Sequence, residues 1–368
     1  MSSLGRISYS TSAVSLLIGL GMVAAANSAV AAVTVAPGYS LSVFAGPLAG
    51  SSAPDSIATV GADVFVGYGN GGNPDGSGGA TSTIAEYTNK GAFVGSITVT
   101  GHNDGLRYDA ATGQLWAIQN EDGNPNLVLI NAKTLSPSAP LSFSSTPHGG
   151  GYDDVAFGQN GTYISASNPQ SNPNTAPAIV SATVAGGTVN VAGVLSGAAT
   201  ATVINGGGTT TLNLQDPDSM VFSRTGALVL DSQADKQLVF VNGIGTVSQA
   251  VSVLNLPSTV DDTIFGGAGQ QRLLFTDRGS GLVYALTGAF SFNQAISAAD
   301  TLNEIVLVNP TTGAFTPLVT GLNGPHGEVL TDVVSSSVPE PAAWSTMLGG
   351  LFGAGALLRR RLVASART

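Results

Sequence analysis

Six acidic residues begin the copies of an internal repeat that runs through residues 54–335. Each copy holds an acid, alternating apolar residues, a glycine turn and a second apolar strand, as in NDGLRYDAATGQLWAI around Asp104. Successive acids are 49, 49, 65, 43 and 67 residues apart. The six acids are Asp55, Asp104, Asp153, Asp218, Asp261 and Glu328.

The three histidines of the chain lie just upstream of these acids, His102 and His326 by two residues and His148 by five. Carboxylates and neutral imidazoles are ligands for Zn²⁺ or Mn²⁺, and oxygens alone suit Ca²⁺. The cofactor that the sequence allows is therefore a divalent cation, Ca²⁺ or Zn²⁺. The candidate metal or ligand residues are His102, Asp104, His148, Asp153, Asp218, Asp261, His326 and Glu328.

Structural roles are the alternative for the same residues. An aspartate at the start of a strand often accepts backbone N–H groups of the adjoining turn, and a histidine in a loop needs no ligand. The loops 73–76 and 120–124 are rich in Asn, Asp and Gly but lack the complete EF-hand pattern, so we interpret them as turns. No catalytic motif stands out, and catalytic residues stay unassigned.

The elements that would position the acids are short strands in groups of four. Repeats of 43 to 67 residues with four strands are typical of propeller blades. We predict an all-β propeller over residues 32–335 with six blades, five or seven being alternatives, and with the acids around one mouth of the central channel. Residues 39–44 would complete the last blade. A β-sandwich array and a parallel β-helix are the rival folds.

Within the repeats, the stretch LLFTDRGSGLVYAL (273–286) resembles the NHL and SMP-30/gluconolactonase-like propellers. That resemblance implies a metal held in the channel by acids and Asn, although the family's spacing does not match here, so no ligand is carried over.

Composition narrows the partners. The formal net charge is −10, and 21 acids face 7 bases between residues 32 and 338, so nucleic acid is excluded as a partner. Cysteine is absent, which excludes disulfides and thiol chemistry.

The first 31 residues have the order of a secretory signal: Arg6, an apolar run over residues 13–26, and small residues before a cleavage site at Ala29, Ala31 or Ala32. An uncleaved anchor is the alternative. Signal peptidase is then a partner of the precursor.

The tail over residues 336–368 has three parts. A VPEP motif is followed by 17 mostly apolar residues, long enough for a slightly short transmembrane helix, and then by an arginine cluster. These residues are Val338, Pro339, Glu340, Pro341, Arg359, Arg360 and Arg361. The tail resembles the PEP-CTERM sorting domain of Gram-negative bacteria, and an ordinary membrane anchor is the alternative.

That resemblance implies processing by an exosortase and an association with exopolysaccharide and biofilm. We expect a precursor in the periplasm or anchored in the inner membrane, and then a cell-surface or extracellular protein. A non-catalytic binding or structural protein is the favoured function. The alternatives are a metal-dependent lactonase or lyase of the SMP-30-like type, acting at the channel mouth, and a spacer in a surface layer.

Overall fold

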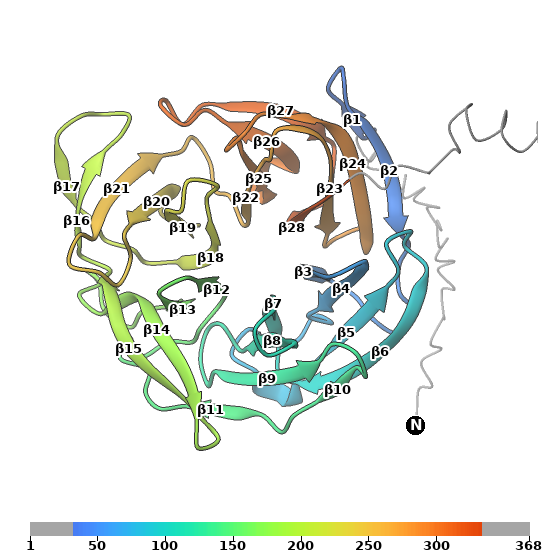
Figure 1. Ribbon diagram of the computed structural model, residues 1–368, viewed down its shortest axis with the longest axis horizontal. Coiled ribbons are helices and arrows are strands. Elements are labelled where there is room, and N and C mark those ends of the chain that lie inside the picture. The colour runs from blue at the N-terminus through green and yellow to red at the C-terminus, as the bar shows by residue number, and fades with distance from the viewer. Residues whose placement is uncertain (1–31, 333–368) are drawn as a thin grey trace, which may run out of the picture. The chain divides into compact units, whose positions relative to one another are not determined.

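The computed structural model describes residues 32–332, and these form a six-bladed β-propeller (Figure 1). The innermost strands of the blades are β3, β7, β12, β18, β22 and β28, and they surround a central channel. The predicted fold class is confirmed. The predicted signal peptide and sorting tail lie outside the described residues. Within residues 32–332, no helix is long and apolar enough to cross a membrane.

The first four blades follow one another along the chain. Blade 1 holds β3 (Pro54–Val60), β4 (Asp63–Tyr68), β5 (Thr81–Tyr87) and β6 (Phe93–Thr100), with the short 3₁₀ helix η1 (Ser77–Gly79) between β4 and β5. Blade 2 holds β7 (Asn103–Asp109), β8 (Gln114–Gln119) and β9 (Asn126–Asn131), with β10 (Ser136–Pro137) and β11 (Leu141–Phe143) at its edge.

Blade 3 holds β12 (Val155–Gly158), β13 (Gly161–Ser165), β14 (Pro177–Ala185) and β15 (Thr188–Ser196). Strand β11 pairs with both β9 and β15, so blades 2 and 3 share one continuous sheet. Blade 4 holds β18 (Pro217–Phe222), β19 (Leu228–Ser232), β20 (Gln237–Asn242) and β21 (Ala250–Asn255). Its outer edge is extended by the hairpin of β16 (Thr200–Val203) and β17 (Thr209–Thr211).

Blades 5 and 6 are interleaved. Blade 5 begins with β22 (Thr263–Phe265), but the chain then leaves it to form β23 (Gly269–Asp277) and β24 (Leu282–Phe290) of blade 6. It returns for β25 (Ala295–Ala299), β26 (Glu304–Val308) and β27 (Phe315–Thr320) of blade 5, with the 3₁₀ helix η2 (Asp300–Leu302) between β25 and β26. It ends with β28 (Pro325–Asp332), the innermost strand of blade 6.

The predicted repeat that begins at Asp261 is therefore wrong in its pairing. Because each repeat holds an acid and two apolar strands around a glycine turn, the pattern predicts that residues 261–277 form the inner hairpin of one blade. Instead β22 pairs with β25, and β23 pairs with β28 and β24. A local strand–turn–strand pattern does not determine which sheet receives the second strand, because pairing depends on partners remote in the sequence.

The N-terminal segment closes the ring. Strand β2 (Ser40–Ala45) is the outermost strand of blade 6, paired with β24, and β1 (Thr34–Val35) is paired with β27 of blade 5. The prediction that residues 39–44 complete the last blade is confirmed. Their pairing covers sheet edges that would otherwise be open to association.

The apolar faces of the strands pack between neighbouring blades. Ile57 and Val66 of blade 1, for example, share a fully buried cluster with Leu274 of blade 6. The predicted glycine turns between the first two strands have positive φ, as at Gly61 (61°) and Gly226 (91°), where a side chain would be strained. This packing holds the start of every inner strand at the same end of the channel.

Candidate metal centre at the channel mouth

The acids gather at the end of the channel where the inner strands begin. Asp55, Asp104 and Asp218 are the second residues of β3, β7 and β18, and Asp153 and Asp261 lie two residues before β12 and β22. Asp104, Asp153, Asp218 and Asp261 line a cavity of about 330 Å³, which we call the acid mouth. Together with Asp55 they also line a much smaller cavity of about 10 Å³. Loops between the second and third strands of the blades add further polar side chains, namely Glu121, Asp122, Ser167, Gln233, Arg278 and Asp300.

Glu328 does not share this position. In β28 the residue equivalent to Asp55 and Asp218 is His326, because each of the three follows a proline that begins its strand. Glu328 pairs with Phe275, as Ile57 pairs with Val66, and lies deeper in the channel. The prediction placed Glu328 in the ring of acids by its charge, whereas strand register places His326 there.

His148 also lies apart from the mouth cluster. It is buried in the loop before β12, where its Nε2 forms a hydrogen bond with the Gly151 carbonyl oxygen and its ring packs on Tyr152. It belongs to none of the groups of potential metal ligands found in residues 32–332. Its position supports a structural role in the loop.

Three carboxylates and one imidazole converge at blades 2 and 3. Asp104, Glu121 and Asp153 each present an oxygen within 4.8 Å of the others, and His102, Asp55 and Asp104 form a second such group. Asp104 belongs to both. Glu121 was missed as a ligand because its loop was interpreted as a simple turn, and its only signal was an acid-rich loop after a strand.

The imidazole of His102 has no hydrogen-bond partner. The side chain is fully buried, and both ring nitrogens lack a protein partner within the described chain. The nearest charged atom is Oε1 of Glu121 at 3.9 Å. Its backbone N–H donates to Oδ1 of Asn120 at 2.9 Å, and the His102 carbonyl accepts from the Asn120 N–H at 2.7 Å, so the residue is firmly held. Buried polar atoms without partners are rare and call for a ligand.

Burial and mutual repulsion favour the protonated form of the carboxyls in this cluster. Burial raises the pKa of Asp104, of Glu121 and of Asp153, and repulsion from the other acids raises each further. A divalent cation would remove the need for those protons, because oxygen ligands bind it in the deprotonated form. The donor set of carboxylates and one histidine fits Mn²⁺ or Zn²⁺, and its carboxylates without the histidine suit Ca²⁺.

A second group lies across the mouth, where His326 is held between two aspartates. Its Nδ1 is 2.8 Å from Oδ1 of Asp261 and 3.4 Å from Oδ1 of Asp55, while Arg278 lies 3.4 Å from the other Asp55 oxygen. Burial opposes the charge on His326, but the two aspartates outweigh it and raise its pKa well above the usual value. Burial likewise opposes charge on Asp55, yet His326 and Arg278 lower its pKa to about 2.

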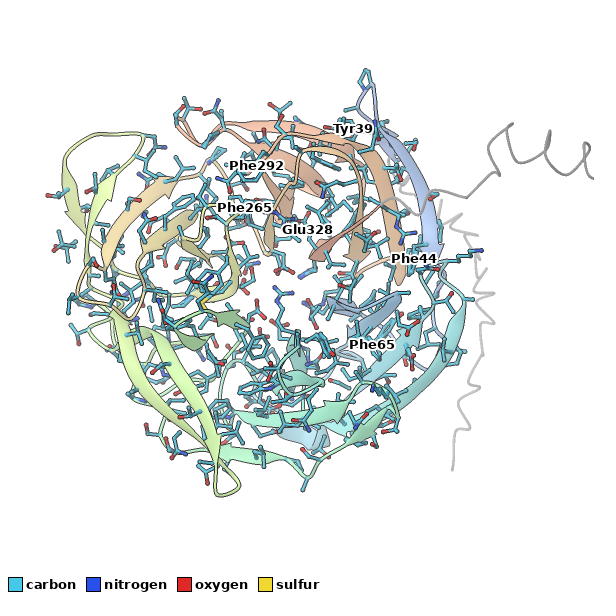
Figure 2. All side chains as sticks on the ribbon, in the orientation of Figure 1. Tyr39, Phe44, Phe65, Phe265, Phe292 and Glu328 are labelled. Atoms are coloured by element: carbon cyan, nitrogen blue, oxygen red, sulfur yellow. The ribbon has the colours of Figure 1, made fainter. Side chains whose placement is uncertain are left out.

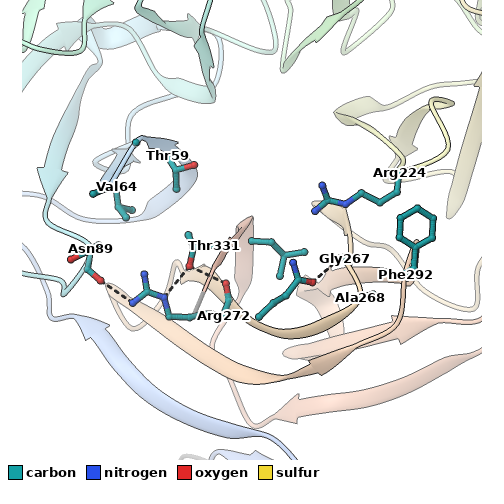
Figure 3. Close-up of a pocket in the computed structure, with 13 residues that line it drawn as sticks. Thr59, Val64, Asn89, Arg224, Gly267, Ala268, Arg272, Phe292 and Thr331 are labelled. Atoms are coloured by element: carbon teal, nitrogen blue, oxygen red, sulfur yellow. Dashed lines mark hydrogen bonds between the residues drawn. The ribbon is translucent and has the colours of Figure 1, made fainter. Parts of the chain in front are cut away.

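A larger hollow lies elsewhere, at the opposite ends of the inner strands (Figure 3). It measures about 660 Å³ and is lined in part by Arg272. That arginine is already bound: its NH1 donates to the Asn89 carbonyl at 2.8 Å and its Nε to the Thr331 hydroxyl at 3.0 Å. The hollow gathers few groups that could do chemistry, so the acid mouth remains the candidate site.

Comparisons with known proteins gave matches among solved structures alone. No protein-family model matches the chain, and no curated protein matches it. Among solved structures, the periplasmic gluconolactonase of Pseudomonas aeruginosa is 12% identical, with 76% of this chain and 88% of that chain covered and a TM-score of 0.40. Virginiamycin B lyase of Staphylococcus aureus is 10% identical, with 80% and 100% covered and a TM-score of 0.41. This chain resembles them in fold alone.

Proposed function

We propose that the acid mouth binds a divalent cation and that the loaded site acts on a small ester or lactone, as a metal-dependent lactonase or lyase. The observation that carries this proposal is the fully buried imidazole of His102, whose two ring nitrogens have no hydrogen-bond partner in the described chain. The ring lies close to the carboxylates of Asp55, Asp104 and Glu121. A bound cation would supply Lewis-acid activation of a carbonyl oxygen.

The other mouth residues have their own parts in this scheme. Asp104, Glu121, Asp153 and His102 would hold the cation. Asp261 and Asp55 favour the protonated form of His326, whose Nδ1 lies 2.8 Å from Asp261, so His326 can act as an acid near the substrate. Arg278, part-exposed at the rim, can orient an anionic or strongly polar group of the substrate.

Metal analysis of the purified protein tests the proposal. We expect one tightly bound divalent cation per chain, lost in Asp104→Asn and weakened at least about tenfold in His102→Ala, since loss of a residue that only supports the ligands already costs about tenfold or more. Gly69→Ala should weaken it too, because a Cβ there would lie 2.6 Å from Cε1 of His102 and displace the ring.

Matched controls are Glu86→Gln, an acid on β5 outside the mouth, and Gly46→Ala, whose added Cβ would meet nothing within 4 Å. A panel of lactones and esters is then assayed with and without chelator. If the wild-type chain binds no cation, or if Asp104→Asn binds it unchanged, the site proposal fails. If the protein binds a cation but turns over none of the substrates, the enzymatic part of the proposal fails and the metal site stands.

We also propose that the chain is an exported surface protein, which the motifs at both ends of the sequence support. The VPEP motif, apolar segment and arginine cluster would be removed by an exosortase after signal peptidase has cleaved near Ala31. The mature protein would then join an exopolysaccharide matrix as a binding protein. Expression with and without an exosortase, followed by mass measurement, tests this. An unprocessed tail in both strains would contradict it.

A further inference from the structure

The half of the channel below the acid mouth is a separate cavity of about 370 Å³, to which all six inner strands contribute. We call it the lower channel. Its walls are mainly apolar, and they include Ile57, Val155, Phe157, Met220 and Ile264. Small-molecule sites are commonly cavities of this size with apolar walls and a few placed polar groups. The question is which polar groups this one offers.

Arg107 separates the lower channel from the acid mouth. Its guanidinium crosses from β7 to Asp154 at 2.7 Å and to Asp262 at 3.4 Å. Asp154 also accepts the Met220 N–H at 3.0 Å. Asp154 and Asp262 therefore already share the positive charge of Arg107. A third carboxylate in this cavity would need another cation as its counter-ion.

Glu328 is that third carboxylate. It lines the lower channel, its side chain is 2% exposed, and neither of its carboxylate oxygens has a hydrogen-bond partner within the described residues. Figure 2 shows it beside the central opening. The equivalent positions of β3 and β18 hold the apolar residues Ile57 and Met220, so packing does not require a carboxylate here. A buried carboxylate without a partner is costly unless something binds it.

We propose that the lower channel binds a small cationic amphiphile, a primary ammonium group on an apolar body, with Glu328 as its counter-ion. The ammonium group has the donors that the two free oxygens lack, and the apolar body fits the walls. The charge balance agrees, since Arg107 offers one positive charge against Asp154, Asp262 and Glu328. This site is independent of the cation proposed for the acid mouth.

A proton should leave on binding. Burial raises the pKa of Glu328 well above its usual value, and repulsion from Asp262, Asp231 and Asp261 raises it further. Among the residues that line the lower channel, Arg107 is the base. Burial and repulsion both favour the protonated form of the free carboxyl, and an ammonium ion would displace that proton. Calorimetry in two buffers with different heats of ionisation measures the release.

The experiment compares 2-phenylethylamine with 2-phenylethanol, which has the same body without the charge. We expect the intact protein to bind the amine at least about tenfold more tightly than the alcohol. Glu328→Gln should abolish that preference and the proton release, while alcohol binding stays within about threefold. Thr59→Trp, which fills the cavity from its part-exposed wall, should weaken both probes.

Glu86→Gln is the matched control and should bind both probes as the parent does. Thermal melting shows whether each variant is folded. If Glu328→Gln is folded and still prefers the amine, the amine binds at other acids, such as those of the acid mouth, and the proposal is wrong. Equal binding of the amine and the alcohol to the parent protein would also overturn it. Either result leaves the cation proposal intact, because that one is measured by metal content.

Discussion

At the scale of single residues, Arg107 links blades 2, 3 and 5 across the channel. It is bound to the start of blade 3 through Asp154 and to the start of blade 5 through Asp262, which itself accepts the Glu328 N–H of blade 6 at 3.2 Å. One guanidinium thus connects blades far apart in the sequence. Burial raises the pKa of Asp154 to about 6, even though Arg107 opposes that rise.

Replacing Arg107 should therefore be costly in a pH-dependent way. We expect Arg107→Met to lower the free energy of unfolding by about 3–5 kcal/mol at pH 8, because two buried carboxylates lose their counter-ion. A raised pKa means that the folded state favours the protonated carboxyl, so the loss should shrink at pH 5. Denaturant unfolding at both pH values measures it. Equal losses would show that Asp154 does not carry the effect.

The sequence predicted part of the site at this scale. The predicted gathering of acids at one mouth is found, because all inner strands begin at the same end of the channel. The acids concerned are Asp55, Asp104, Asp153, Asp218 and Asp261. The prediction misplaced Glu328 because it aligned β28 with the other inner strands by the position of an acid. The proline that begins the strand gives the correct register and places His326 at the mouth. Glu121 could not be assigned, because the reach of a loop depends on its tertiary contacts.

At the scale of elements, β1 and β2 close the propeller from outside. Phe44 and Ala45 at the end of β2 are buried in the cluster between blades 1 and 6. Without these strands, β24 and β27 would become open edges.

A chain that begins at Gly46 tests this closure. We expect it to lose at least about 3–5 kcal/mol of unfolding free energy, the cost of removing one buried phenylalanine such as Phe44. The open edges should also make it associate. Denaturant unfolding and light scattering measure both effects. A synthetic peptide of residues 33–46 should restore the monomer, and a stable monomeric truncation would contradict the role given to β2.

The interleaving of blades 5 and 6 could not be predicted at this scale. The local patterns of residues 261–277 and 282–286 correctly predict the strands β22, β23 and the first part of β24. The sequence does not show which strands pair with each other. Strand β23 pairs with β28, about 50 residues downstream, and not with the adjacent β22. Such a choice is made by global packing and leaves no local periodicity.

At the scale of the whole molecule, the described chain is one ring with two differently built halves of a channel. The upper half gathers carboxylates, and the lower half gathers apolar walls around Glu328. The acidic balance predicted from composition is concentrated at that upper end. The net charge follows from the composition alone. Where the acids gather follows from the arrangement of the blades around the channel.

The pairing of β2 with β24 also fixes an order of events during synthesis. Ser40 pairs with Thr287, so the first of these strands leaves the ribosome long before its partner exists. At about 5–20 residues per second, that wait lasts on the order of ten seconds or more. The earliest strands made are thus among the last to pair, and a chaperone that holds the nascent N-terminus would have most to offer this protein.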